Sequence, residues 1–174
     1  MFLIIKYFSK LIKALSSDAS PKQIAAGFIL GMIIGLTPLF SIHNLIIIVL
    51  ILGLKVNLGF VILAFTFFSG VAHLADPIFH NFGIWLLEKE NYQSFWVHMY
   101  NNEWWAITRF YNTVVIGSFI SSIILSVAMF PSVVLFVKQY RLHIHAKFQN
   151  WKIVKALKGT KIYSIYVMVS KIKG

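Results

Sequence analysis

The chain has 174 residues, of which 59% are hydrophobic and 12% are charged, and its formal net charge is +11. A soluble protein is about 45–50% apolar, and here the excess is gathered into long runs, so the composition indicates an integral membrane protein of one domain rather than a soluble one. Because the chain contains no cysteine, disulfides, thiolate zinc sites and cysteine nucleophiles are excluded.

Residues 1–19 predict an amphipathic helix that lies in the membrane interface. Lys6, Lys10 and Lys13 recur at helical spacing, and apolar side chains fill the other face. A signal peptide is the competing interpretation, but lysines interrupt the apolar stretch and no small-residue cleavage pattern follows. Ser20 and Pro21 then suit the cap and first turn of a new helix.

Residues 24–54 predict a short, broken helical hairpin. Two apolar runs, 24–36 and 42–54, are separated by Thr37-Pro38-Leu39-Phe40-Ser41, where the proline ends the first run and Ser41 suits the N-cap of the second. Each run gives about 20 Å of helix against about 30 Å of hydrocarbon. The hairpin therefore either spans with the help of its flanks or is re-entrant, with its tip inside the membrane.

Three glycines of the first run, Gly27, Gly31 and Gly35, recur every four residues and so share one helix face. Such a face lets a neighbouring backbone approach closely, which predicts helix packing. The sequence leaves open whether the partner is the run 58–75 or a helix of another chain.

Two longer runs predict transmembrane helices. The first covers residues 58–75, with Asn57 at its start and Asp76-Pro77 at its end. Residues 77–111 hold four of the five tryptophans among polar side chains, so they are expected to lie outside, on the membrane surface. The second covers residues 113–137 and has no charged residue. The membrane domain is thus expected at 20–137.

The tail, 138–174, carries nine basic residues and no acid, and its first part predicts a basic surface helix. Fourteen Lys and Arg residues fall on one side of this topology and two on the other, which places both termini in the cytoplasm. The positive charge is therefore expected to meet anionic phospholipid. The lysines assigned to lipid are Lys6, Lys10, Lys13, Lys147, Lys152, Lys155 and Lys158.

The stretch 20–60, SPKQIAAGFILGMIIGLTPLFSIHNLIIIVLILGLKVNLGF, resembles the bacterial membrane family known as domain of unknown function 2062. The resemblance rests on the Ser-Pro start, the small residues every four positions, the turn Pro38-Leu39, and a basic residue before Asn57. It extends over roughly residues 20–137. Where the family typically has Asn-Pro, this chain has Asp76-Pro77, which departs from the pattern by adding a charge. The resemblance implies a protein of the bacterial inner membrane and hints at a large envelope protein as partner, without supplying an activity.

The hairpin tip is the first candidate site. If the hairpin is re-entrant, Thr37, Ser41, His43 and Asn44 would join the free amides of the second arm in binding an anionic headgroup or phosphate. The alternative, which is favoured, is that these residues only satisfy the backbone of the turn and cap at the outer surface.

A second candidate site consists of His73, Asp76 and His80, which share one face of a continuing helix and could bind a divalent metal. The competing interpretation, a polar cluster where a span leaves the membrane, is favoured, so no metal and no other cofactor is assigned.

No nucleophile elbow, phosphate-binding loop or zinc-protease signature occurs, so no enzyme activity is expected. The favoured function is an accessory or anchoring subunit of an envelope assembly, related to lipid transport. The alternative is an independent lipid or small-solute transporter that uses a re-entrant hairpin; a metal-dependent membrane enzyme ranks third. The expected partners are anionic phospholipid, an envelope protein with a large extracytoplasmic domain, and a second copy of the chain, but not nucleic acid.

Overall fold

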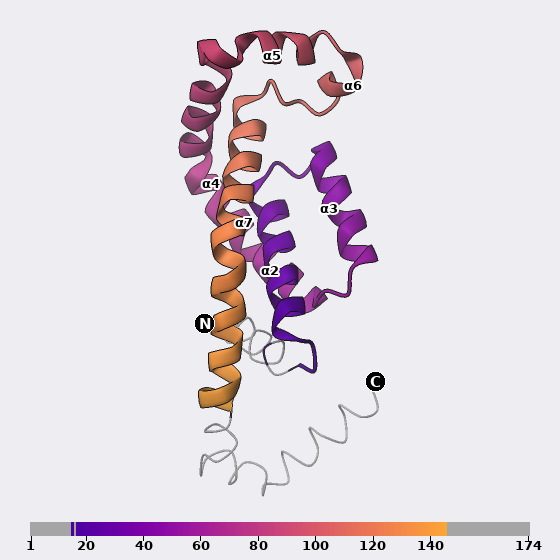
Figure 1. Ribbon diagram of the computed structural model, residues 1–174, viewed down its shortest axis with the longest axis vertical. Coiled ribbons are helices and arrows are strands. Elements are labelled where there is room, and N and C mark those ends of the chain that lie inside the picture. The colour runs from indigo at the N-terminus through magenta and orange to yellow at the C-terminus, as the bar shows by residue number, and fades with distance from the viewer. Residues whose placement is uncertain (1–14, 16, 146–174) are drawn as a thin grey trace, which may run out of the picture. The chain divides into compact units, whose positions relative to one another are not determined.

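The computed structural model describes residues 15 and 17–145 and shows an all-helical protein (Figure 1). The described residues form six α-helices and a π-helical turn: α2 (Pro21–Leu36), α3 (Ile42–Gly53), α4 (Leu58–Glu88), α5 (Glu90–Tyr100), α6 (Glu103–Ala106), α7 (Thr113–Gln139) and η1 (Tyr140–His145). The seven lysines assigned to lipid, most of the N-terminal surface helix and the tail beyond residue 145 lie outside the described residues.

The chain divides into two compact units, Met1–Leu135 and Phe136–Gly174. The first unit contains α2 to α6 and most of α7. The described part of the second contains the end of α7 and η1.

Two helices are long and apolar enough to cross a membrane, one starting at Leu58 and the other at Thr113, as the sequence predicts. The 31 residues of α4 extend about 46 Å, which exceeds the roughly 30 Å of a bilayer's hydrocarbon core. The apolar helices α2 and α3 have 16 and 12 residues and are only about 24 and 18 Å long.

The boundaries of α2 follow from its local sequence. The Ser20 hydroxyl accepts a hydrogen bond from the backbone N–H of Gln23 at 3.2 Å, and the Gln23 side chain accepts one from the Ser20 N–H at 2.7 Å. This reciprocal capping box, followed by Pro21, starts the helix. At the other end Thr37 has an extended backbone, as expected for the residue before Pro38.

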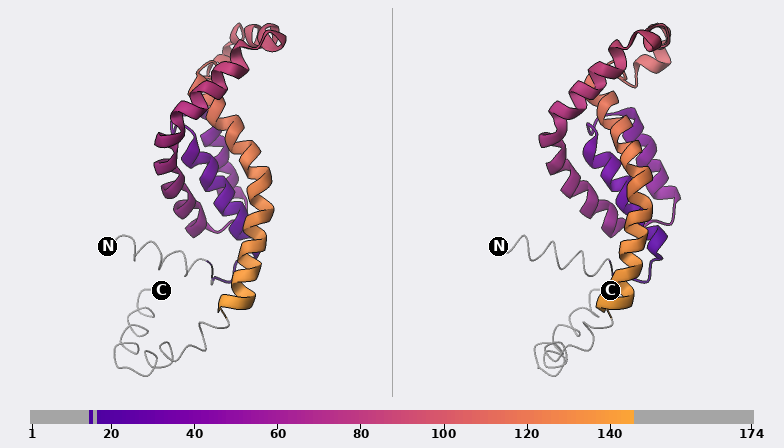
Figure 2. Two further views of the ribbon diagram at one scale, coloured as in Figure 1. Left: turned by 90° about the vertical axis from the view of Figure 1, so that its left-hand side faces the viewer. Right: turned by 60° about the vertical axis from the view of Figure 1, so that its left-hand side comes forward.

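The glycine face of α2 packs on α4 of the same chain, which settles the question of its partner. A Cβ atom on Gly27 would lie 2.6 Å from the carbonyl oxygen of Asn57, and one on Gly35 would lie 2.9 Å from that of Phe65. The contacts advance along both helices together, so α2 and α4 run in the same direction. Helix α3, which follows α2 in the sequence, brings the chain back toward the start of α2, where α4 begins. The hairpin of α2 and α3 lies beside the first part of α4 (Figures 1 and 2).

Asn57 joins the start of α4 to the start of α2. Its side-chain oxygen caps α4 by accepting from the N–H of Phe60 at 3.1 Å, and its own N–H donates to the carbonyl of Gln23 at 3.2 Å. Its side-chain amide also donates to the Ser17 hydroxyl at 3.0 Å. This residue of the family motif therefore fixes the register of the two parallel helices.

The prediction that Asp76-Pro77 ends the helix is wrong, because α4 continues through Pro77 to Glu88. A proline removes one backbone hydrogen bond, and a helix tolerates this as a kink where its two sides are held by neighbours. Beyond Pro77, α4 packs on α7: a Cβ atom on Gly83 would collide with the carbonyl of Thr113, and one on Gly117 with that of Phe79. Figure 2 shows α4 bowed rather than straight.

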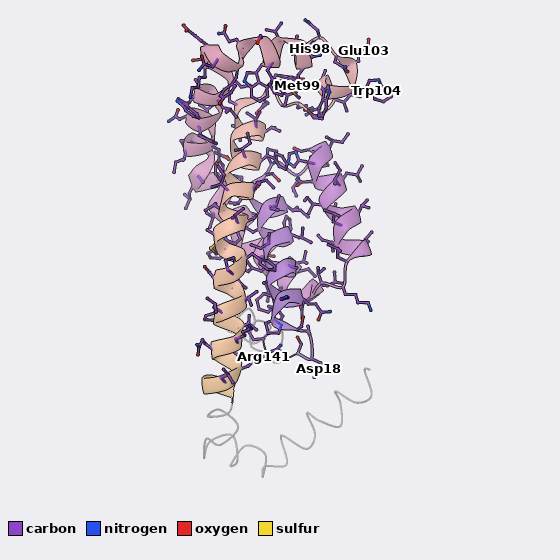
Figure 3. The ribbon with its side chains drawn as sticks, viewed as in Figure 1. Asp18, His98, Met99, Glu103, Trp104 and Arg141 are labelled. Carbon is purple, nitrogen blue, oxygen red and sulfur yellow. The ribbon has the colours of Figure 1, made fainter. Side chains whose placement is uncertain are left out.

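The aromatic segment after α4 folds on itself. The indole N–H of Trp96 donates to the carbonyl of Leu86 at 3.0 Å, and the ring stacks on Phe110 with 5.8 Å between centroids. Trp104 is 82% exposed, and it lies with Glu103 at the opposite end of the unit from Asp18 (Figure 3). The segment therefore presents aromatic rings outward at the end remote from the start of α2.

Gly31→Ala tests the close approach of α2 and α4. The added Cβ would collide with the carbonyl of Val61 and lie 3.0 Å from the Cβ of Ala64, so we expect the free energy of unfolding to fall by about 1–3 kcal/mol. The measurement is thermal or denaturant unfolding of the purified protein. Gly70→Ala is the control, because nothing lies within 4 Å of a Cβ there. Equal stability of the two variants would contradict this packing.

Candidate functional site

A pocket of about 370 Å³ lies where the tip of the α2–α3 hairpin meets α4. One wall is the end of α2 and the turn after it, the other is one face of α4, and α7 contributes a single side chain. The lining residues are Gly35, Leu36, Thr37, Pro38, Leu39, Phe40, Ser69, Ala72, His73, Asp76 and Val114. The pocket thus brings the family-motif residues Pro38, Leu39 and Asp76 together, although they are far apart in the sequence.

The α4 wall consists of Ser69, Ala72, His73 and Asp76, whose spacing of i, i+3, i+4 and i+7 places them on one helix face. The nearest oxygen of Asp76 lies 4.0 Å from the Nδ1 of His73, and the two side chains are 48% and 89% exposed. An ion pair at this distance between accessible groups contributes little. Asp76 is also the only acidic residue between Asp18 and Glu88.

The polar side chains of the turn hydrogen-bond within the turn. Asn44 is 2% exposed, and its side-chain amide donates to the carbonyl of Pro38 at 2.9 Å. Its side-chain oxygen lies 2.9 Å from the Thr37 hydroxyl. That hydroxyl is also 2.8 Å from the carbonyl of Ile33. Ser41 occupies the N-cap position of α3, but its hydroxyl donates to the carbonyl of Pro38 at 2.7 Å instead of capping the helix. These groups are directed at the turn's own backbone.

Of the four residues considered as a possible anion site, only Thr37 lines the pocket. His43 instead packs its ring on Phe119 of α7, with 4.6 Å between centroids, and its Nε2 is buried without a hydrogen-bond partner. The N-terminal end of α3 therefore contributes no residue to the lining, whereas the C-terminal end of α2 contributes Gly35 and Leu36.

The three residues considered as a candidate metal site do not all face one another. His80 does lie on the same continuing helix as His73 and Asp76, but its Nδ1 is 2.7 Å from the hydroxyl of Thr113 on α7. Among the described residues, no group of three His, Asp or Glu side chains is close enough to hold a metal ion. His80 therefore connects α4 to α7 near their glycine contact.

Two parts of the pocket were not singled out from the sequence. Ser69 lies seven residues before Asp76, a spacing that could have assigned it to the same face. The C-terminal end of α2 lines the pocket only because that side of the hairpin tip faces α4. That is a property of the tertiary packing, and no local pattern reports it.

Comparison with known proteins identifies a family but no activity. Residues 6–145 match the family model of domain of unknown function 2062, described as an uncharacterized protein conserved in bacteria. The match covers most of the chain, so the chain belongs to this family, as its resemblance indicated. No curated protein and no solved structure matches it.

Asn44→Ala tests whether the turn depends on its buried amide. The substitution leaves the carbonyl of Pro38 and the hydroxyl of Thr37 with fewer partners, and we expect it to lower the free energy of unfolding by about 1–3 kcal/mol. Ser132→Ala serves as control, because its exposed hydroxyl bonds only to the carbonyl of Ala128 on its own helix. Thermal unfolding of both variants is the measurement, and an unchanged midpoint for Asn44→Ala would refute the role of the amide.

Proposed function

We propose that this member of domain of unknown function 2062 is a protein of the bacterial inner membrane that binds a lipid headgroup or small solute at the tip of a re-entrant hairpin and transports it. The observation that carries the proposal is the pocket between the hairpin tip and Asp76. An ionisable residue on an apolar, span-length helix that faces a cavity is the arrangement from which solute pathways in membranes are built.

Helix lengths support the re-entrant geometry. Gly35 meets α4 at Phe68 and Ser69, and α4 continues from there to Glu88, a further 28 Å or so. At about 24 and 18 Å, α2 and α3 are shorter than the roughly 30 Å of hydrocarbon. If Leu58 lies at the inner boundary, the tip ends below the outer headgroups. Irregular backbone at that depth is tolerated where it lines a cavity or is buried in protein.

The distribution of basic residues along the sequence supports cytoplasmic termini. Lys22 and Lys55 lie close to the joined starts of α2 and α4, where Asn57 bonds to Gln23. Lys89 and Arg109 lie beyond the other end of α4. In the sequence, fourteen of the sixteen Lys and Arg residues either precede Leu58 or follow Thr113. By the positive-inside rule this bias favours a cytoplasmic position for the start of α2 and an outer position for α5 and α6.

A lipid fits the surroundings of the pocket better than a fully hydrated solute does. Helix α3, which descends from the tip, exposes a continuous apolar face, with Leu45, Ile46 and Val49 each more than half exposed. Acyl chains would lie along this face while the headgroup occupies the pocket at its upper end. The mechanism is then the movement of a headgroup through this pocket, with its chains remaining in the hydrocarbon.

A second candidate is the accessory or anchoring subunit of an envelope assembly. The observation that favours it is the outward exposure of aromatic side chains in and after α5, notably Trp104 and Tyr100. Exposed aromatic residues of this kind are enriched at protein–protein interfaces. The partner would be an envelope protein whose extracytoplasmic domain contacts this end of the unit.

A depth measurement tests the re-entrant hairpin. The chain has no native cysteine, so Phe40→Cys, at a tip position that is 95% exposed, can carry a single bimane label. With the protein in vesicles containing brominated phospholipids, we expect the label to be quenched most strongly by bromine on the acyl chains. Trp104→Cys is the control for the outer surface, where quenching by headgroup-proximal bromine should dominate. Equal depth of the two labels would reject re-entrance.

Native extraction tests the transport function against the accessory function. The tagged protein is extracted in a lipid-preserving polymer and everything retained is identified by mass spectrometry. We expect stoichiometric phospholipid, reduced severalfold in Ala72→Trp because the indole fills the pocket. Ala128→Trp, which adds the same side chain at an exposed position of α7, should retain it. A stoichiometric envelope protein that is lost in Trp104→Ala would instead support the accessory function.

A further inference from the structure

We propose that the pocket at the hairpin tip binds an alkali-metal cation, held between the carboxylate of Asp76 and the carbonyl end of α2. The inference rests on the pocket of the proposed function and adds a ligand of defined charge to it. It also differs in sign from the anion site that the sequence offered as one interpretation of the residues at the start of α3.

The first argument is the charge of Asp76. No Lys or Arg occurs between Lys55 and Lys89, so α4 itself provides no permanent positive charge to pair with this carboxylate. Its carboxylate lies 4.0 Å from the Nδ1 of His73, which carries a charge only when it is protonated. A carboxylate on an apolar helix is costly unless it is protonated or compensated by a cation.

The second argument is the set of carbonyl groups at the end of α2. Pro38 has no N–H to donate to the carbonyl of Ile34. Among the described residues, no backbone N–H donates to the carbonyl of Gly35 or of Leu36. Both of these residues line the pocket. The negative end of the α2 dipole lies at the same place and favours a positive charge there.

The α4 wall adds two more oxygen atoms. Pro77 has no N–H to offer the carbonyl of His73, so that acceptor loses its intrahelical partner. The hydroxyl of Ser69 lies on the same face of the helix, two turns before Asp76. Together with the end of α2, these groups are the acceptors available to an otherwise apolar pocket, while the amide end of α3 contributes no lining residue.

The donor set selects the kind of cation. Carboxylate, carbonyl and hydroxyl oxygens are the ligands of hard cations. One carboxylate balances one positive charge, which favours Na⁺ or K⁺ over a divalent ion. Half-helix carbonyl ends combined with a side-chain oxygen at membrane depth are the arrangement by which transporters hold a coupling cation. A lipid or solute in the same pocket would then be bound together with this cation.

The test is the thermal unfolding of the full chain in detergent micelles, followed by tryptophan fluorescence in NaCl, KCl or choline chloride at equal ionic strength. We expect a saturable rise of the midpoint with Na⁺ or K⁺ and none with choline. In Asp76→Asn the apparent affinity should fall at least about tenfold. Glu88→Gln, which removes an acid outside the pocket lining, should behave like the unmodified chain.

Equal midpoints in the three salts, or an undiminished response in Asp76→Asn, would overturn the proposal. So would stabilisation by ethanolammonium but not by Na⁺ or K⁺, because the ligand would then be a headgroup amine. If Asp76→Asn does not fold, Ser69→Ala takes its place with a severalfold weaker response expected, and an unchanged response refutes the site. The assay depends on neither tip depth nor lipid retention, so its failure is distinguishable from failure of the proposed function.

Discussion

The contact on which the rest of the fold depends is the close approach of α2 and α4 through Gly27, Gly31 and Gly35. Because the two helices run in the same direction, the chain between them has to return over the full length of α2, and α3 does this. Between apolar helices in lipid there is no hydrophobic driving force, so van der Waals contact across small residues holds such pairs together. The glycine face therefore fixes where α2 ends against α4, and with it the position of the turn. The pocket is a consequence of that register.

Two prolines determine the chemistry of the pocket. Pro38 ends α2 and Pro77 interrupts the hydrogen bonds of α4, and each removes a donor beside the same space. The acceptors left over lie near the one carboxylate of that part of the chain, while the side chains of Thr37, Ser41 and Asn44 are occupied in holding the turn. This composition is the basis on which we propose a cation there. The residue types of the turn alone left two interpretations open, since hydroxyl and amide groups are equally suited to an anion or to their own backbone.

Local signals in the sequence identified much of the fold. The capping box of Ser20, the end of α2 before Pro38 and the packing face of its glycines all follow from interactions within a few residues. The continuation of α4 beyond Pro77 did not follow, because it depends on contacts of Gly83 and Gly117 with a helix that begins 25 residues after α4 ends. For the same reason Asp76 and His73 could be singled out as polar residues, but their meeting with the hairpin tip could not.

The parallel arrangement of α2 and α4 has a consequence for biosynthesis. When α2 and α3 leave the ribosome, the helix that will cover the glycine face has not yet been made, and neither arm is long enough to cross the bilayer alone. The hairpin is therefore expected to wait at the interface or in the insertion machinery until α4 follows. Asn57, which bonds back to Gln23, would be the first residue of α4 to engage it. From that point the two helices can pack progressively from Gly27 to Gly35, and the tip would be the last part of the hairpin to be enclosed.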